Sequence, residues 1–313
     1  FVGIAIPDLS PLLPVLGTIG LILIVLEGSL ELELERKKYP YIRKIALVSC
    51  LQILLVSLSA AYAFSVYSGA PLKSCLLNAI PLSIISSAIA IPSVRHLSAD
   101  TREFITYESS LSDIFGVILF NFIVLNEVIS IASVGSFLVE LLLLLVITII
   151  ATVILTYLLS KIRHHVKFVP IILMVVLVYG ITKNLHLPSL IFILLFGLFL
   201  GNFGKLKSNQ YIQQLHPDYL MREIRRFREL TTELAFLIRA LFFLMFGFLL
   251  RSGDLMNQST LVWSLAVCGG IFIIRYVSLK LLRLPIMPSL LIAPRGLITV
   301  LLFLSVPVTQ SVS

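Results

Sequence analysis

Charged residues are scarce in this sequence. They make up 13% of the 313 residues, whereas a soluble globular domain carries roughly a quarter. Hydrophobic residues account for 58%, and apolar runs of about 20 residues, each long enough to cross a hydrocarbon core of ~30 Å, recur along the chain. The alternating pattern of membrane β-strands is absent. The sequence therefore predicts an all-α polytopic membrane protein.

Residues that build enzyme and metal sites are also few. The three cysteines lie in or beside apolar runs without CxxC spacing, which is typical of small hydrophobic residues rather than disulfides or metal ligands. All five histidines fall in connections or at the ends of apolar runs. HExxH, GxSxG, GxGxxG and phosphate-binding loops do not occur in a suitable context. We therefore expect neither an enzyme nor a cofactor.

The basic residues are distributed unevenly over the predicted connections. Nineteen of the 24 Lys and Arg belong to alternate connections, and the opposite connections hold three. This asymmetry places the basic connections in the cytoplasm and accounts for the net charge of +8, so no nucleic-acid partner is expected. Ten spans are predicted, near 11–34, 41–66, 74–97, 104–128, 135–160, 167–183, 187–202, 232–251, 259–280 and 287–307.

One long polar segment, 203–230, divides the chain. It contains six basic and three acidic residues, with large apolar residues at helical spacing. This pattern predicts an amphipathic helix on the cytoplasmic surface. We interpret the segment as a linker between a first group of spans in 1–202 and a second group in 231–313.

Two predicted spans, 80–94 and 285–307, are interrupted by proline. Proline removes a backbone donor, and lipid tolerates the freed carbonyl only where protein or a water-filled cavity satisfies it. One such helix is ordinary, but a pair on either side of a central linker is typical of inverted-repeat transporters. The prolines are Pro81, Pro92, Pro285, Pro288 and Pro294.

Two carboxylates lie at the start of an apolar run, in 107-YESSLSDIFG-116. Glu108 and Asp113 are five residues apart, or about 140° around a helix, so they face different directions. Asp113 shares a helix face with Ser109, and Glu108 shares one with Ser112. One acid can therefore face a pathway while the other binds a fixed partner, because ionised acids inside hydrocarbon are costly.

Two arginines fall inside predicted spans, Arg239 and Arg295. A buried guanidinium needs an anion or several carbonyls, and losing a partner leaves a costly bare charge. Four deep acids are available against these two bases, so at least one carboxylate is left free to titrate. The acids are Glu27, Glu108, Asp113 and Glu140.

Four motifs resemble the monovalent cation/proton antiporter superfamily, in its sodium/proton exchanger branch. YESSLSD resembles the ESxxND segment, LIVLEGSLELEL the early FxxGLxLxL helix, IRALFFLMFGFLL the late helix with a basic residue before FFxxxG, and APRGLITVLLFLSVP the arginine-bearing broken helix. They occur in the family's order across residues 20 to 307. The resemblance implies two inverted repeats with broken helices crossing at mid-membrane. Roughly two helices would then precede residue 1 and one would follow residue 313.

The resemblance also implies roles for individual residues. Asp113 matches the acid that binds cation and proton in turn, with Ser109 and Ser112 as further ion ligands. Glu108 and Arg295 match a structural ion pair, and Arg239 matches a supporting base. The sequence departs from the family at two places. Ser112 replaces the Asn before the aspartate, and Ala90, Ile91 and Pro92 replace a Thr-Asp-Pro motif in the broken helix.

We therefore predict a secondary transporter that exchanges Na+ or K+ for a proton, without net charge movement because Ser112 cannot titrate. It is expected in a lipid bilayer, as a homodimer in the bacterial inner membrane. Two alternatives stay open. One is a broken-helix symporter of an organic anion, held by Arg295 or Arg239. The other is a membrane scaffold or sensor that transports nothing.

Overall fold

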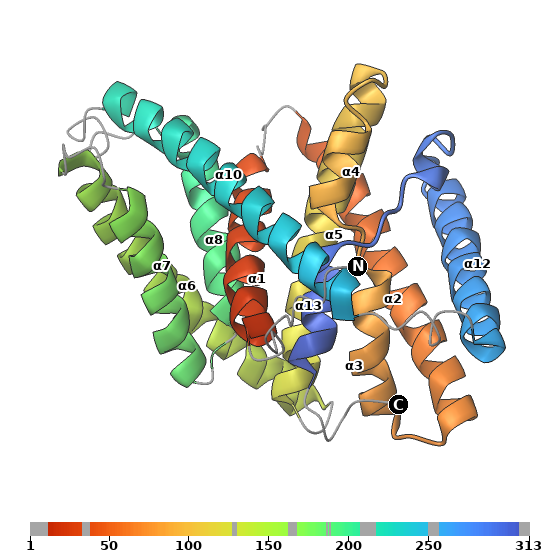
Figure 1. Cartoon of the computed structure of the whole chain (residues 1–313). Coiled ribbons are helices and arrows are strands. Elements are labelled where there is room, and N and C mark those ends of the chain that lie inside the picture. Colours follow the sequence, from red (N-terminus) through yellow and green to blue (C-terminus); the bar gives the residue numbers. More distant parts are fainter. Residues whose placement is uncertain are drawn as a thin grey trace, which may run out of the picture.

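The computed structural model describes residues 12–32, 38–126, 130–161, 168–185, 187, 189–206, 217–249 and 257–306. All regular elements within these ranges are helices, as predicted (Figure 1). Their bounds are α1 Leu12–Glu31, α2 Tyr39–Ser68, α3 Leu72–Ser83, α4 Ser87–Ser93, α5 Ala99–Leu125, α6 Ile131–Lys161, α7 Phe168–Asn184, α8 Ser189–Gly201, η2 Phe203–Leu206, α10 Pro217–Leu249, α12 Gln258–Leu281, η3 Ser289–Leu291 and α13 Leu297–Ser305.

Five segments within the described ranges are long and apolar enough to cross a bilayer. Two shorter apolar helices, α7 and α8, accompany them. The prediction of about ten spans is thus confirmed in part. The five segments are Tyr39–Ser68, Leu72–Ser93, Ala99–Leu125, Ser133–Ile154 and Leu261–Leu281.

The central polar segment differs from the prediction of a surface helix followed by a separate span. From Pro217 the chain continues as one helix, α10, to Leu249. Leu220, Ile224 and Phe227 are buried on this helix, so its first half packs against the bundle. No glycine or proline interrupts its first seven turns, and proline at the first position favours a helix start. Residues 207–216 of the predicted linker lie outside the described ranges.

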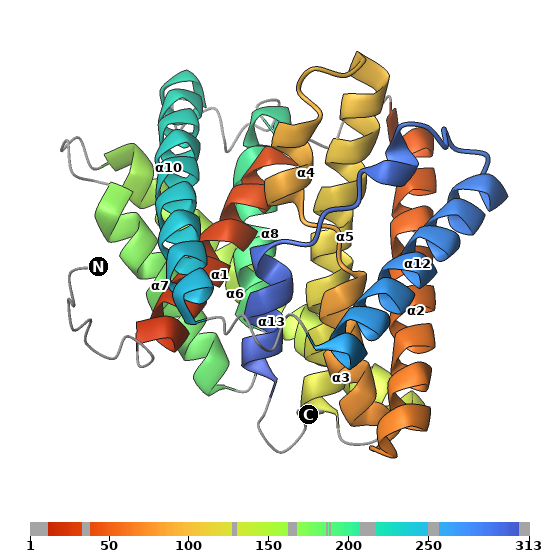
Figure 2. The ribbon, with the colours of Figure 1, turned by 45° about the vertical axis from the view of Figure 1, so that its right-hand side comes forward.

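The helices form two groups that lie side by side (Figures 1 and 2). α2, α3, α5 and α12 pack together in one group, and α1 packs with α8 and α10 in the other. Side chains on the outer faces of α2, α6 and α12 are large, apolar and exposed, as expected for surfaces in contact with lipid.

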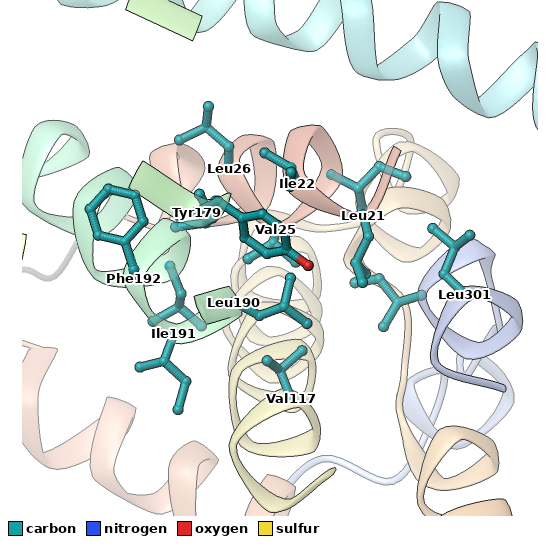
Figure 3. Packing of buried hydrophobic residues seen from close by; sticks show 14 of the residues in the cluster. Leu21, Ile22, Val25, Leu26, Val117, Tyr179, Leu190, Ile191, Phe192 and Leu301 are labelled. Carbon is teal, nitrogen blue, oxygen red and sulfur yellow. The ribbon is translucent and has the colours of Figure 1, made fainter. Parts of the chain in front are cut away.

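Two glycines one turn apart bring α8 close to α1. A Cβ atom on Gly201 would lie 2.6 Å from the carbonyl oxygen of Leu30, and one on Gly197 would collide with the Ser29 hydroxyl. Small residues at this spacing let backbones approach closely in membranes, where dispersion contacts rather than the hydrophobic effect hold helices together. The close contact helps to form a buried apolar cluster in which α1, α5, α8 and α13 meet (Figure 3).

Candidate functional site

The first interrupted helix breaks at Ile84–Ser86, between α3 and α4. Three consecutive backbone N–H groups lose their helical acceptors there and find others. Ile85 donates to the hydroxyl Oγ of Ser112 at 2.9 Å, and Ser86 donates to the carbonyl of Pro294 at 2.9 Å. Ser87 donates to Oδ2 of Asp113 at 3.1 Å. α5 and the second interrupted segment thus supply every acceptor, as the absence of water in a bilayer requires.

This break lies within the interrupted helix predicted at 80–94, but Ala90, Ile91 and Pro92, expected as its broken backbone, are not the extended residues. These residues belong to α4, one turn beyond the extended residues. Pro92 has no N–H for the carbonyl of Ala88, four residues earlier. Nη1 of Arg239 donates to that carbonyl at 3.2 Å instead, so the helix continues through the proline with its acceptor satisfied.

The second interrupted segment runs from the end of α12 through η3 to the start of α13. Within it, Nε of Arg295 donates to the carbonyl of Leu82 at 2.9 Å, and Nη1 donates to the carbonyl of Ala293 at 2.6 Å. The break frees the Leu82 carbonyl at the end of α3, so Arg295 takes the place of the missing backbone donor. Glycine is required at 296, because a Cβ atom there would lie 2.6 Å from Cβ of Ser86.

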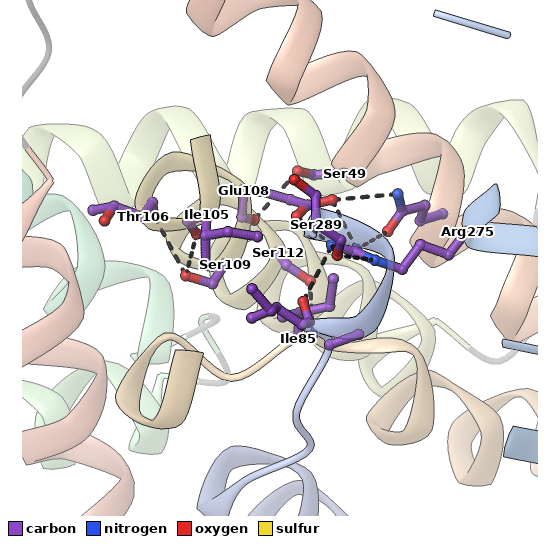
Figure 4. Close-up of polar contacts among 12 residues, drawn as sticks. Ser49, Ile85, Ile105, Thr106, Glu108, Ser109, Ser112, Arg275 and Ser289 are labelled. Atoms are coloured by element: carbon purple, nitrogen blue, oxygen red, sulfur yellow. Dashed lines mark hydrogen bonds and ion pairs between the residues drawn. The ribbon is translucent and has the colours of Figure 1, made fainter. Parts of the chain in front are cut away.

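Glu108 binds Arg275, which corrects the predicted pairing with Arg295. Nη2 of Arg275 lies 2.7 Å from Oε2 of Glu108, and Nη1 lies 2.8 Å from Oε1 (Figure 4). Both residues are 1% exposed. Gln52 on α2 contacts both partners, at 3.0 Å from Arg275 and 3.3 Å from Glu108. This two-pronged geometry is the strong form of an arginine–carboxylate pair.

Arg275 also holds the second interrupted segment. Nε and Nη2 donate to the carbonyl of Ser289 at 3.0 and 2.6 Å, and Nη2 donates to that of Ile292 at 3.1 Å. Sequence reasoning missed this residue because its charge was assigned to the basic connection after the span. The signal was present, since Arg275 follows four apolar residues inside the predicted span 259–280.

Arg239 and Glu27 form a second, less buried ion pair. Nη2 of Arg239 lies 2.5 Å from Oε2 of Glu27, with the two side chains 15% and 12% exposed. The pair connects α10 to α1, and the bond from Arg239 to Ala88 extends the contact to α4. Glu27 was not among the predicted site residues.

Asp113 and Ser86 keep free acceptor atoms at the break. Oδ1 of Asp113 and Oγ of Ser86 are buried and have no hydrogen-bond partner among the described residues. Ser109 does not contribute to this group, because its hydroxyl donates to the carbonyl of Ile105 in its own helix at 2.7 Å (Figure 4). The role of Ser109 as an ion ligand stays a prediction, as does that of Ser112, whose Oγ already holds Ile85.

A membrane bundle in which two interrupted helices meet beside a buried carboxylate has the architecture of a broken-helix secondary transporter. The family profile described as "Sodium/hydrogen exchanger, transmembrane" matches residues 1–309. The chain therefore belongs to the sodium/hydrogen exchanger family, whose members are transporters of the membrane rather than enzymes.

Solved structures with the same fold include two of the sodium proton antiporter MjNhaP1 from Methanocaldococcus jannaschii. The first, at pH 8, has a TM-score of 0.66 and 19% sequence identity, and the match covers 93% of this chain and 72% of that one. The second, from electron microscopy, has a TM-score of 0.60 and 18% identity, covering 93% and 71%. Comparison with curated proteins finds no match. At these identities the structures establish the fold alone.

Proposed function

We propose that this chain exchanges a monovalent cation, Na+ or K+, for a proton at Asp113. One observation carries the proposal: a buried carboxylate binds the break through one oxygen and leaves the other without a partner among the described residues, and the buried hydroxyl of Ser86, one residue before the donor Ser87, is likewise without one. Buried polar atoms without a partner are costly, and such groups at a helix interruption indicate a ligand.

The mechanism follows from the chemistry of the carboxylate. Oxygen atoms are the ligands that hard cations prefer. A cation bound by Asp113 and Ser86 occupies the oxygen that would otherwise carry a proton, so the two compete for one site. Alternating exposure of that site to the two sides of the membrane then couples the two fluxes.

The contacts of the neighbouring groups support exchange without net charge movement. Ser112 carries no titratable proton, and its hydroxyl oxygen holds the N–H of Ile85. Glu108 forms a two-pronged ion pair with Arg275, and Glu27 forms an ion pair with Arg239. Among the described residues, Asp113 is the acid at the break that keeps a carboxylate oxygen free, and exchange of one proton for one monovalent cation there moves no net charge.

The alternative of an organic-anion symporter has less support. It requires an arginine that is unpartnered until substrate arrives. Arg239 already binds Glu27 and the carbonyl of Ala88 through its two Nη atoms, and only its Nε has no partner among the described residues. Arg295 binds two carbonyls. The alternative of a scaffold that transports nothing does not explain why buried oxygens of Asp113 and Ser86 have no hydrogen-bond partner among the described residues.

Orientation, location and assembly belong to the same proposal. The basic connections would face the cytoplasm of a bacterium whose inner membrane holds the protein as a homodimer. The excess of Lys and Arg in alternate connections supports the orientation. Location and homodimer formation stay predictions.

Cation-driven proton flux in proteoliposomes tests the proposal. Asp113→Asn should abolish flux while the variant folds and inserts, and Asp100→Asn, an exposed acid at the start of the same helix, should leave flux unchanged. Flux by Asp113→Asn at the wild-type rate would rule out this site. A wild-type rate that follows an imposed potential would rule out electroneutrality, since each uncompensated charge gains about 2.3 kcal/mol per 100 mV.

A further inference from the structure

A cavity of about 720 Å³ lies at the end of the bundle where α5 and α13 finish, enclosed by these helices and by α1, α6, α7 and α8. Its lining includes the polar side chains of Asn121, Glu140, Tyr179 and Lys183. Two smaller cavities, of about 290 and 250 Å³, are lined almost entirely by apolar side chains. A space of this size with several polar groups is suited to water, whereas apolar cavities stay dry.

This cavity points along α5 toward Asp113. Asp113, Val117 and Asn121 are four residues apart and share one face of the helix, so Asn121 lies about 12 Å from Asp113 along the axis. Val117 is fully buried between them. The cavity therefore ends about two turns of α5 short of Asp113.

An apolar layer closes the gap between the cavity and Asp113. We define it as Leu21, Val117, Leu190 and Leu301, which come from α1, α5, α8 and α13 (Figure 3). Packing is tight here, because a Cβ atom on Gly17 would lie only 3.0 Å from Cδ2 of Leu301. A layer without polar groups prevents water from reaching Asp113 from this side.

Glu140 is the acid of the cavity. It lies on α6, and its Oε2 is buried without a hydrogen-bond partner among the described residues. A charge in a cleft with low-dielectric walls focuses the potential and raises the local concentration of the opposite ion. Lys183, on α7, lines the same cavity with the opposite sign. Lys183 is also one of the three basic residues in the connections that hold few Lys and Arg. The positive-inside rule places these connections on the side of the membrane away from the cytoplasm.

We propose that this cavity is the outer aqueous approach to Asp113, and that Glu140 concentrates the monovalent cation within it. The apolar layer separates this approach from the ion site in the conformation described. The inference rests on the proposed exchange function, and it adds a cation-attracting residue and a route for the cation.

Cysteine accessibility tests the aqueous approach. Cys50, Cys75 and Cys268 are replaced by alanine, and right-side-out vesicles are treated with a membrane-impermeant methanethiosulfonate reagent. Asn121→Cys, with Ser305→Cys as a second cavity position, should react on the order of tenfold faster than Leu143→Cys, because a thiol in hydrocarbon does not ionise. Leu143 is the matched control, exposed on the outer face of α6. Cavity cysteines that react no faster than Leu143→Cys would overturn the proposal.

The labelling rates of cationic and anionic reagents test whether Glu140 attracts cations into the cavity. In the Asn121→Cys protein, Glu140→Gln should lower the ratio of labelling rates for cationic and anionic reagents about threefold, and Lys183→Gln should raise it. Glu103→Gln, an acid paired with Lys38 on the basic-connection side, should leave the ratio unchanged. A ratio that does not respond to Glu140→Gln would overturn the role of this residue.

Transport gives an independent measurement. Glu140→Gln should raise the cation KM about threefold at low ionic strength without changing kcat. The effect should vanish in roughly 1 M inert salt, where the Debye length is about 3 Å. Labelling requires no transport, so the two proposals fail separately. If labelling is charge-selective but the protein shows no exchange, the cavity proposal stands and the exchange proposal is overturned. If exchange is normal but the Asn121→Cys variant does not react, the cavity proposal alone is overturned.

Discussion

The two interrupted segments meet at one point but satisfy their backbones in different ways. The first presents three N–H groups, which a serine hydroxyl, a carboxylate and a carbonyl accept, and one carbonyl, that of Leu82, to which Arg295 donates. The second presents carbonyls, to which two arginines donate. The acceptors of the first segment include Asp113, which keeps one carboxylate oxygen without a partner among the described residues. The donors of the second include Arg275, which also binds Glu108 through two hydrogen bonds. This difference supports the proposal that the second segment braces the site and that the cation binds at the first.

The largest effect should follow from breaking the brace. Glu108→Ala and Arg275→Ala should each lower the free energy of unfolding by ~3–5 kcal/mol, because each leaves a buried charge without its partner. Denaturation by SDS in mixed micelles measures this loss. The double variant should lose less than the sum of both. Additive losses would show that the two charges do not depend on each other.

Arg275→Lys sharpens the same test. Lysine keeps the charge but cannot supply the planar fork that reaches Glu108, Ser289 and Ile292 together. We expect a loss of about 1.5–3 kcal/mol, the usual contribution of hydrogen bonds to charged groups. Wild-type stability of Arg275→Lys in the same SDS titration would mean that charge alone holds the segment.

Arg295→Gln tests the shared end of the two segments. It removes the charged donor to the carbonyls of Leu82 and Ala293, so the free energy of unfolding should fall by about 1.5–3 kcal/mol. Combined with Glu108→Ala, the losses should add, since Glu108 binds Arg275. Strong coupling between positions 108 and 295 would restore the pairing expected from the sequence.

Ser112→Ala tests the donor-presenting segment. It leaves the N–H of Ile85 buried without an acceptor, at a cost of about 1–3 kcal/mol. Ser109→Ala is the matched control on the same helix. It removes only a bond from the hydroxyl to its own helix, so its effect should stay below about 1 kcal/mol. Equal thermal stability of the two variants would contradict the assigned contact.

The smallest effect should come from the exposed pair Lys38–Glu103, whose side chains are 39% and 30% exposed. Water screens such charges, so Lys38→Ala should change the free energy of unfolding by about 0–1 kcal/mol. A loss as large as that of Arg275→Ala would mean that burial does not determine how much the Lys38–Glu103 and Arg275–Glu108 pairs contribute to stability.

The extent of successful prediction differs between helices and contacts. Five of the ten predicted spans correspond to described segments that are long and apolar enough to cross a bilayer, because length and composition decide whether a segment can cross lipid. At 203–230 the structure differs from the expected separate surface helix, because Leu220, Ile224 and Phe227 are buried and the helix that contains them continues without a break to Leu249. The first interrupted helix was predicted at 80–94 from Pro81 and Pro92, and its break lies inside that range, at Ile84–Ser86. The helix continues through Pro92 because Arg239 satisfies the carbonyl that the proline frees.

By itself, the sequence determined that the chain is a helical membrane protein and, through short local motifs, that it resembles the family to which it belongs. It also singled out Asp113, since an acid deep in an apolar run is costly wherever the helix packs. Only the tertiary structure decided that Glu108 binds Arg275 and that Arg295 binds carbonyls. Both arginines lie far from Glu108 in sequence, and spacing along one helix does not specify partners from another. A buried charge or freed backbone group in lipid binds whichever complementary group the packing of helices brings within reach.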